Sequence, residues 1–71
     1  MPIYCVNKNV QANGDHEVHD LSIGKCTRLP ETYNRLDLGY HPNCQSAVQK
    51  AKSIYWKSNG CYYCCPSCHT S

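Results

Sequence analysis

Cysteine and histidine gather in two parts of this 71-residue chain, and both side chains bind metal ions through sulfur or nitrogen. Towards the start lie His16, His19 and Cys26, and near the end lie Cys61, Cys64, Cys65, Cys68 and His69. Such a pattern is typical of a metal site or of thiol chemistry. The spacing of the residues favours the first of these.

Cys61 and Cys64 form a Cys-x-x-Cys sequence. In a tight turn both sulfurs can point at one ion about 2.3 Å away, and the N–H groups of the turn stabilise the thiolates. A tetrahedral site needs a second pair of ligands, and a strand end and the loop after it can bring His19 and Cys26 to the turn. We therefore expect His19, Cys26, Cys61 and Cys64 to bind one Zn2+ ion.

Cys68 and His69 are the alternative second pair, because with Cys61 and Cys64 they place four donors within nine residues. A site built from these residues alone would stabilise the fold little, since it would leave the front half of the chain free. Ligands from both halves close a long loop and contribute more. This argument favours His19 and Cys26.

The sequence His16-Glu17-Val18-His19 differs from the His-Glu-x-x-His sequence of metalloproteases, whose histidines lie four residues apart on a helix. In a strand, His16 and His19 would point to opposite faces and would not share one metal. The chain also lacks paired carboxylates, a Gly-rich phosphate loop and a Ser-His-Asp arrangement. We expect no enzymatic activity.

The composition gives an independent reason to expect a cross-link. Ile, Leu and Val together number only 11 of the 71 residues, and Phe is absent. A single domain of this size, residues 1–71, needs a covalent or metal cross-link to stay folded.

We expect Cys5 and Cys44 to be core residues, and no role is assigned to Cys65.

The N-terminus shows no signal peptide, and no apolar run is long enough to cross a membrane. These features predict a cytoplasmic protein. In a reducing compartment, thiols favour metal binding over disulfides.

Several short strands and one helix are expected to carry these ligands. A strand is predicted at residues 3–6. A hairpin is predicted around the turn signal Asn13-Gly14, with Val10–Ala12 and Glu17–Leu21 as its two strands. A further strand is predicted at Arg35–Tyr40, with Leu36, Leu38 and Tyr40 on one face. The helix is predicted from Cys44 to Lys57. Asn43 is its N-cap, Ala47, Val48, Ala51, Ile54 and Tyr55 form its apolar stripe, and Asn59-Gly60 ends it.

The predicted fold class is therefore α+β: a small zinc-stapled domain in which about three antiparallel strands pack on one helix. The Cys-x-x-Cys knuckle follows the helix directly.

The order of these features resembles the Ada-type metal-binding domain. The resemblance spans residues 16–64 and rests on His19, Cys26, Leu29-Pro30, Asn34-Arg35, a helix containing Ala47-Val48, and Gly60-Cys61-x-x-Cys64. It implies one zinc held by two ligands after an early strand and by a terminal Cys-x-x-Cys. Phosphotriester repair is not implied, because His19 stands where the methyl-accepting members have a reactive cysteine. The chain also resembles small uncharacterised bacterial proteins that end in Cys-His-Thr.

The function expected from the sequence is a non-catalytic zinc-binding module that mediates interactions. A net charge of +2 gives nucleic acid little to bind, so a protein partner is slightly favoured, although Tyr62 and Tyr63 could stack on bases. No membrane contact is expected, and the oligomeric state is left open. The alternatives are a cytosolic thiol redox protein or sensor using Cys61, Cys64 and Cys65, and an exported mini-protein stapled by disulfides.

Overall fold

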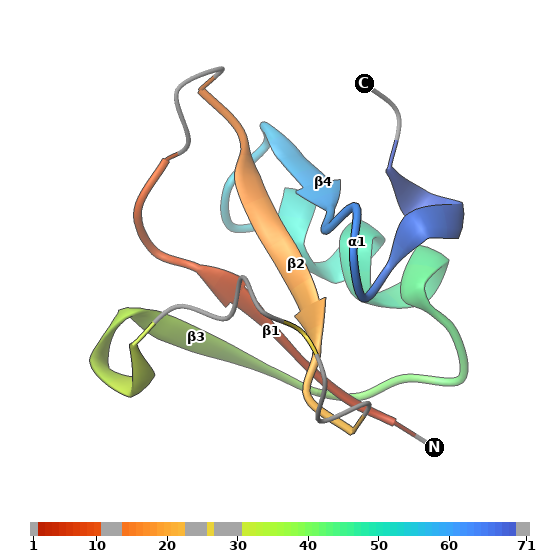
Figure 1. Cartoon of the computed structure of the whole chain (residues 1–71). Helices are drawn as coiled ribbons and strands as arrows, with labels where there is room; N and C mark the ends of the chain where they lie inside the picture. Colours follow the sequence, from red (N-terminus) through yellow and green to blue (C-terminus); the bar gives the residue numbers. More distant parts are fainter. Residues whose placement is uncertain (1, 11–13, 23–25, 27–30, 70–71) are drawn as a thin grey trace.

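The computed structural model describes residues 2–10, 14–22, 26 and 31–69, which form a four-stranded mixed sheet with one helix (Figure 1). In chain order the elements are β1 (Ile3–Asn7), β2 (His16–Asp20), the 3-10 helix η1 (Thr32–Asn34), β3 (Arg35–Tyr40), α1 (Cys44–Lys52), β4 (Ser58–Gly60) and the 3-10 helix η2 (Pro66–Cys68). The predicted α+β class is confirmed. The sheet has four strands instead of about three, and one of them is parallel to its neighbour.

The strands lie in the order β3-β1-β2-β4, with β1 antiparallel to both β2 and β3. The sequence predicted that Val10–Ala12 would pair with residues 17–21. This prediction is wrong at Val10, which is exposed and belongs to no strand. Residues 11–13 lie outside the described part of the chain. Instead β2 pairs with β1, so that Cys5 lies directly opposite His19.

Strand β3 follows the prediction as far as Leu38, which is buried. Its register against β1 then shifts, because Tyr4 pairs with Gly39 and Cys5 with Asp37. Gly39 has a φ of 82°, a conformation that side chains with a Cβ rarely adopt. After this bulge Tyr40 does not continue the buried face and is 67% exposed.

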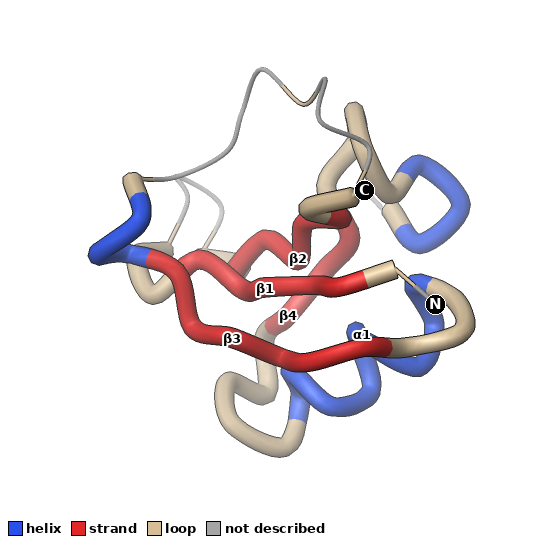
Figure 2. Tube along the Cα trace, turned by 90° about the horizontal axis from the view of Figure 1, so that it is seen from below, coloured by secondary structure: helices blue, strands red, loops and turns tan. Residues whose placement is uncertain are grey.

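Helix α1 covers one face of the sheet, as Figure 2 shows. Val6 and Val18 of the central strands belong to the same apolar core as Ala47 and Ala51 of the helix, and all four are fully buried. Because side chains alternate along a strand, Cys5 and His19 point to the opposite face. The helix therefore packs against the face that carries Val6 and Val18, and Cys5 and His19 lie on the other face.

Helix α1 begins as predicted, since the side chain of Asn43 accepts a hydrogen bond from the N–H of Ser46. It ends at Lys52 instead of Lys57. The β-branched and aromatic residues 54–56 are poorer helix formers, and the Ser53 hydroxyl donates to the carbonyl of Lys50, which closes the last turn. None of the described helices could span a membrane.

The early helix end lets the chain return to the sheet. The ring of Tyr55 stacks on that of His16 at 3.9 Å, and the N–H of His16 donates to the carbonyl of Lys57. The next residues form β4, parallel to β2, where the sequence predicted only a helix stop. Gly60 does not have the positive φ expected of such a stop.

Cys44 and Cys68 form a disulfide that ties the first residue of α1 to η2. This corrects two expectations: Cys44 is not an unbonded core residue, and Cys68 is not free to bind a metal. Gly60 lies beneath η2, because a Cβ at this position would come within 2.6 Å of the Cβ of Cys68. The C-terminal segment is thus fixed to both the helix and β4.

We expect Cys44→Ser/Cys68→Ser to lower the free energy of unfolding by about 3 kcal/mol, because the disulfide removes the entropy of a loop of about 25 residues from the unfolded chain. Urea unfolding of the wild type and the double variant at the same metal content measures the change. A phosphine reductant should lower the stability of the wild type to that of the double variant and leave the variant unchanged. An unchanged wild type would contradict the assignment.

Candidate metal centre

The parallel pair of β2 and β4 brings together two parts of the chain that carry predicted ligands. Val18 pairs with Gly60, and beyond this pair the N–H of Cys61 donates to the carbonyl of Val18 at 2.9 Å. His19 follows Val18 directly. Both strands run in the same direction, so the residues that follow this pair lie side by side.

A tight turn after β4 places the second cysteine. The N–H of Cys65 donates to the carbonyl of Cys61 at 2.8 Å, which closes the turn that carries Cys64. The Cys64 sulfur also accepts the backbone N–H of Asp20 at 3.4 Å. Cys64 is thus held against the end of β2, next to His19.

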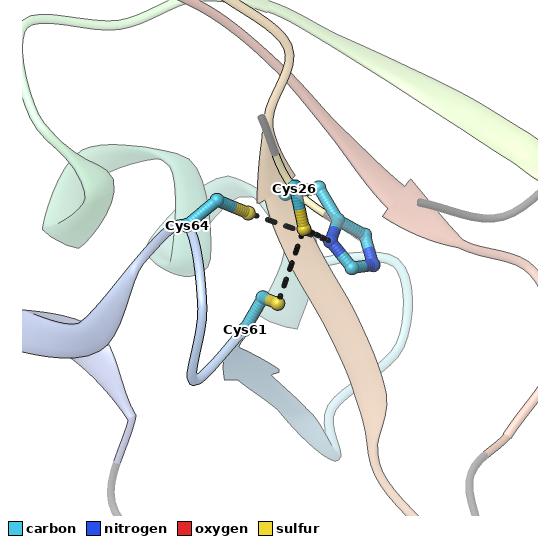
Figure 3. A group of neighbouring side chains, drawn as sticks. Cys26, Cys61 and Cys64 are labelled. Atoms are coloured by element: carbon cyan, nitrogen blue, oxygen red, sulfur yellow. Dashed lines mark hydrogen bonds between the residues drawn. The ribbon is translucent and has the colours of Figure 1, made fainter. Parts of the chain in front are cut away.

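The fourth residue, Cys26, lies on the segment between β2 and β3 and completes a group of four (Figure 3). Its sulfur is 3.7 Å from the Cys61 sulfur and 3.6 Å from Nδ1 of His19. The Cys64 sulfur is 3.5 Å from the same nitrogen. All four donor atoms lie within 4.8 Å of one another, so the group could hold a metal ion.

These separations can be compared with those of a tetrahedral zinc site. With Zn–S bonds of about 2.3 Å and Zn–N bonds of about 2.05 Å, two sulfurs lie about 3.8 Å apart and a sulfur and a nitrogen about 3.6 Å apart. The sulfur pair at 3.7 Å and the sulfur–nitrogen pairs at 3.5 and 3.6 Å fall within about 0.1 Å of these values. Three of the six donor pairs thus already have the separations of a tetrahedral zinc site, and the other three lie within 4.8 Å.

The protonation of His19 suits it to bind a metal. The imidazole is fully buried, and its burial, together with the positive charge of Arg35, lowers its pKa from 6.5 to about 4. His19 is therefore neutral near pH 7, which is the form that donates a lone pair to a metal.

The cysteines, in contrast, hold their protons when no cation is near. Burial raises the pKa of Cys61 to about 12, even though the N–H groups of Cys64 and Tyr63 stabilise its thiolate. Hydrogen bonding with the Cys65 thiol, and then burial, raise the pKa of Cys64. A cation at the centre of the group would favour the thiolate forms.

The other ring nitrogen of His19, Nε2, lies on the side of the ring away from the cysteine sulfurs. Within the part of the chain that the structure describes, Nε2 of His19 is buried without a hydrogen-bond partner. A carboxylate oxygen of Glu17 lies 3.8 Å from it, too far for a hydrogen bond. Sequence reasoning gave Glu17 no role, although alternation along a strand places residues 17 and 19 on the same face.

The structure thus brings together the four residues preferred from the sequence and not the alternative pair. Cys68 is bonded to Cys44. His69 lies outside the group: its ring packs edge-on against Tyr62, and its Nδ1 lies 3.2 Å from the carbonyl oxygen of Gly60.

The remaining cysteines and histidines that the sequence singled out occupy different places. His16 points to the face opposite His19, as predicted, and its Nδ1 lies 2.8 Å from the carbonyl oxygen of Asn7. Cys5 is buried as expected, and its burial raises its pKa to about 11. Cys65 is buried next to Cys64 and forms no disulfide.

Comparison with protein families, curated proteins and solved structures found no match to this chain. The resemblance to the Ada-type domain therefore stays a prediction, and the argument for function rests on the geometry of the four residues.

Metal binding should release protons, and the pKa values predict from which residues. Cys61 and Cys64 are protonated at pH 7.5 and must lose their protons to bind, whereas His19 is already neutral and releases none. We expect at least two protons per zinc ion, measured with a pH indicator in weakly buffered solution. Affinity should therefore rise with pH. Release of fewer than two protons would contradict binding through these thiolates.

Proposed function

We propose that this protein is a non-catalytic zinc-binding module in which one Zn2+ ion is held by His19, Cys26, Cys61 and Cys64. The observation that carries the proposal is the group of four donor atoms within 4.8 Å of one another, three of whose six separations match the edges of a zinc tetrahedron. Three soft thiolates and one imidazole favour zinc over magnesium or calcium, which prefer oxygen ligands.

The donor set also favours a structural role for the zinc. Four protein ligands fill a tetrahedral ion and leave no position for water or substrate, whereas catalytic zinc sites keep one position open. The centre would join β2, the segment containing Cys26 and the turn after β4. This is the long-range cross-link that a chain with so few aliphatic residues needs.

Two further features weigh against the alternatives. A thiol redox enzyme needs an accessible cysteine with a lowered pKa, whereas Cys61 and Cys64 are buried and their pKa values are raised. An exported mini-protein would be stapled by several disulfides, but Cys44–Cys68 is the one disulfide among the described residues. A cytoplasmic location remains a prediction, because that disulfide is better suited to an oxidising compartment.

The interaction partner is the least constrained part of the proposal. Tyr62 and Tyr63 lie between two of the ligands, are 62% and 57% exposed, and contact each other edge to face. Exposed tyrosines on a rigid turn suit a protein interface, where aromatic residues are enriched. A net charge of +2 supplies little attraction for nucleic acid, so we favour a protein partner.

Native mass spectrometry of the protein with its free cysteines reduced should show one zinc ion per chain. A strong chelator should unfold the protein, because zinc binding and folding are coupled in such domains. Cobalt substitution should give the absorption of a tetrahedral ion with thiolate charge-transfer bands. Cys26→Ser should weaken those bands by roughly a third, since it removes one thiolate of three.

Cys65→Ser and His69→Ala are the matched controls, because both change a donor near the centre that is not assigned as a ligand. Both variants should keep one metal ion and the cobalt spectrum of the wild type. A metal-free protein that keeps its fold in chelator would disprove the proposed function. Loss of metal in a control but not in Cys26→Ser would disprove the ligand assignment.

A further inference from the structure

The unpartnered nitrogen of His19 is the starting point. The ring is fully buried, with Nδ1 facing the sulfurs of Cys26 and Cys64 and Nε2 facing away from them. Among the residues that the structure describes, nothing accepts a hydrogen bond from Nε2. Buried polar atoms without a partner are rare in folded proteins and call for an explanation.

Metal binding makes this nitrogen a donor. When Nδ1 gives its lone pair to an ion, the single proton of the neutral imidazole must sit on Nε2. A buried N–H group without an acceptor loses its hydrogen bond to water without replacing it, and this loss would weaken metal binding. Histidines that bind metals therefore nearly always donate their other N–H to a carboxylate, a carbonyl or a water molecule.

Glu17 is placed to supply that acceptor. It lies two residues before His19 on β2 and therefore on the same face, its side chain is only 13% exposed, and its Oε1 is 3.8 Å from Nε2. A movement of about 1 Å, within reach of a side-chain rotation, would bring the two atoms to hydrogen-bond distance. The carboxylate of Asp20, in contrast, already accepts from Ser22.

We propose that Glu17 is a positioning residue of the metal centre, whose carboxylate accepts the Nε2–H of His19. This hydrogen bond keeps the proton on Nε2, fixes the plane of the ring with Nδ1 towards the cysteines, and makes Nδ1 a stronger donor to the metal. The inference rests on the proposed zinc site and adds a residue that does not itself bind the ion.

The first test is zinc affinity, measured by competition with a chromophoric chelator. We expect Glu17→Ala to bind zinc about 10- to 100-fold more weakly than the wild type. Glu17→Gln keeps an acceptor oxygen without the charge, so its zinc affinity should lie between those of the wild type and Glu17→Ala. Glu31→Gln removes a negative charge from an exposed position and should leave the affinity unchanged.

A second measurement separates positioning from a general loss of structure. In the zinc-saturated wild type, nitrogen-15 NMR should show the His19 proton on Nε2 and in slow exchange with water. With zinc saturating and the fold intact by circular dichroism, Glu17→Ala should speed up this exchange, whereas Glu31→Gln should not.

The two proposals fail in different ways. A wild-type protein that binds no zinc would disprove the metal site and the role of Glu17 with it. If the wild type binds one zinc and Glu17→Ala matches Glu31→Gln in both affinity and proton exchange, the metal site stands and the role of Glu17 is disproved.

Discussion

The parallel pairing of β2 with β4 is the contact on which the candidate metal centre depends. The bond from the Cys61 N–H to the carbonyl of Val18 continues the pairing by one residue, and the donors begin where it ends. A shift of this short pairing by one residue would turn the side chains of β4 to the opposite face and move Cys61 away from His19. The ends of two strands that are far apart in the sequence thus share one site, with α1 and β3 lying between them in the chain.

Burial affects the two kinds of donor in opposite ways. It keeps the imidazole of His19 neutral and therefore ready to bind, but it also keeps the thiols of Cys61 and Cys64 protonated. The positive charge of Arg35 acts on both His19 and Cys5. A zinc ion with three thiolates and one imidazole carries a net charge of −1, so a nearby guanidinium would partly balance the charge of the loaded centre.

The sequence predicted the identity of the four clustered residues better than the path of the chain between them. Their spacing and the need for a long-range cross-link pointed to His19, Cys26, Cys61 and Cys64, because these arguments depend on chemistry and loop length alone. The strand at residues 35–40 and the cap at Asn43 likewise depend on local interactions and were predicted, although the alternation along the strand holds only as far as Leu38. Strand β4 was not predicted, because Ser58, Asn59 and Gly60 have low strand propensity. These residues are buried through contacts with other elements, among them β2 and η2. The Cys44–Cys68 disulfide was missed for a related reason: only the three-dimensional fold brings the start of the helix to η2.

The bulge in β3 affects more than the direction of Tyr40. Strand β3 is an outer strand of the sheet, so one side of its backbone is not paired within the sheet. A straight outer strand can pair with the same strand of another molecule and start aggregation. Gly39 interrupts the regular spacing of N–H and carbonyl groups along this edge, and the exposed carboxylate of Asp37 adds a charge that a second copy would meet. The same irregularity that spoils the predicted alternation thus makes this edge a poorer template for pairing with a second copy.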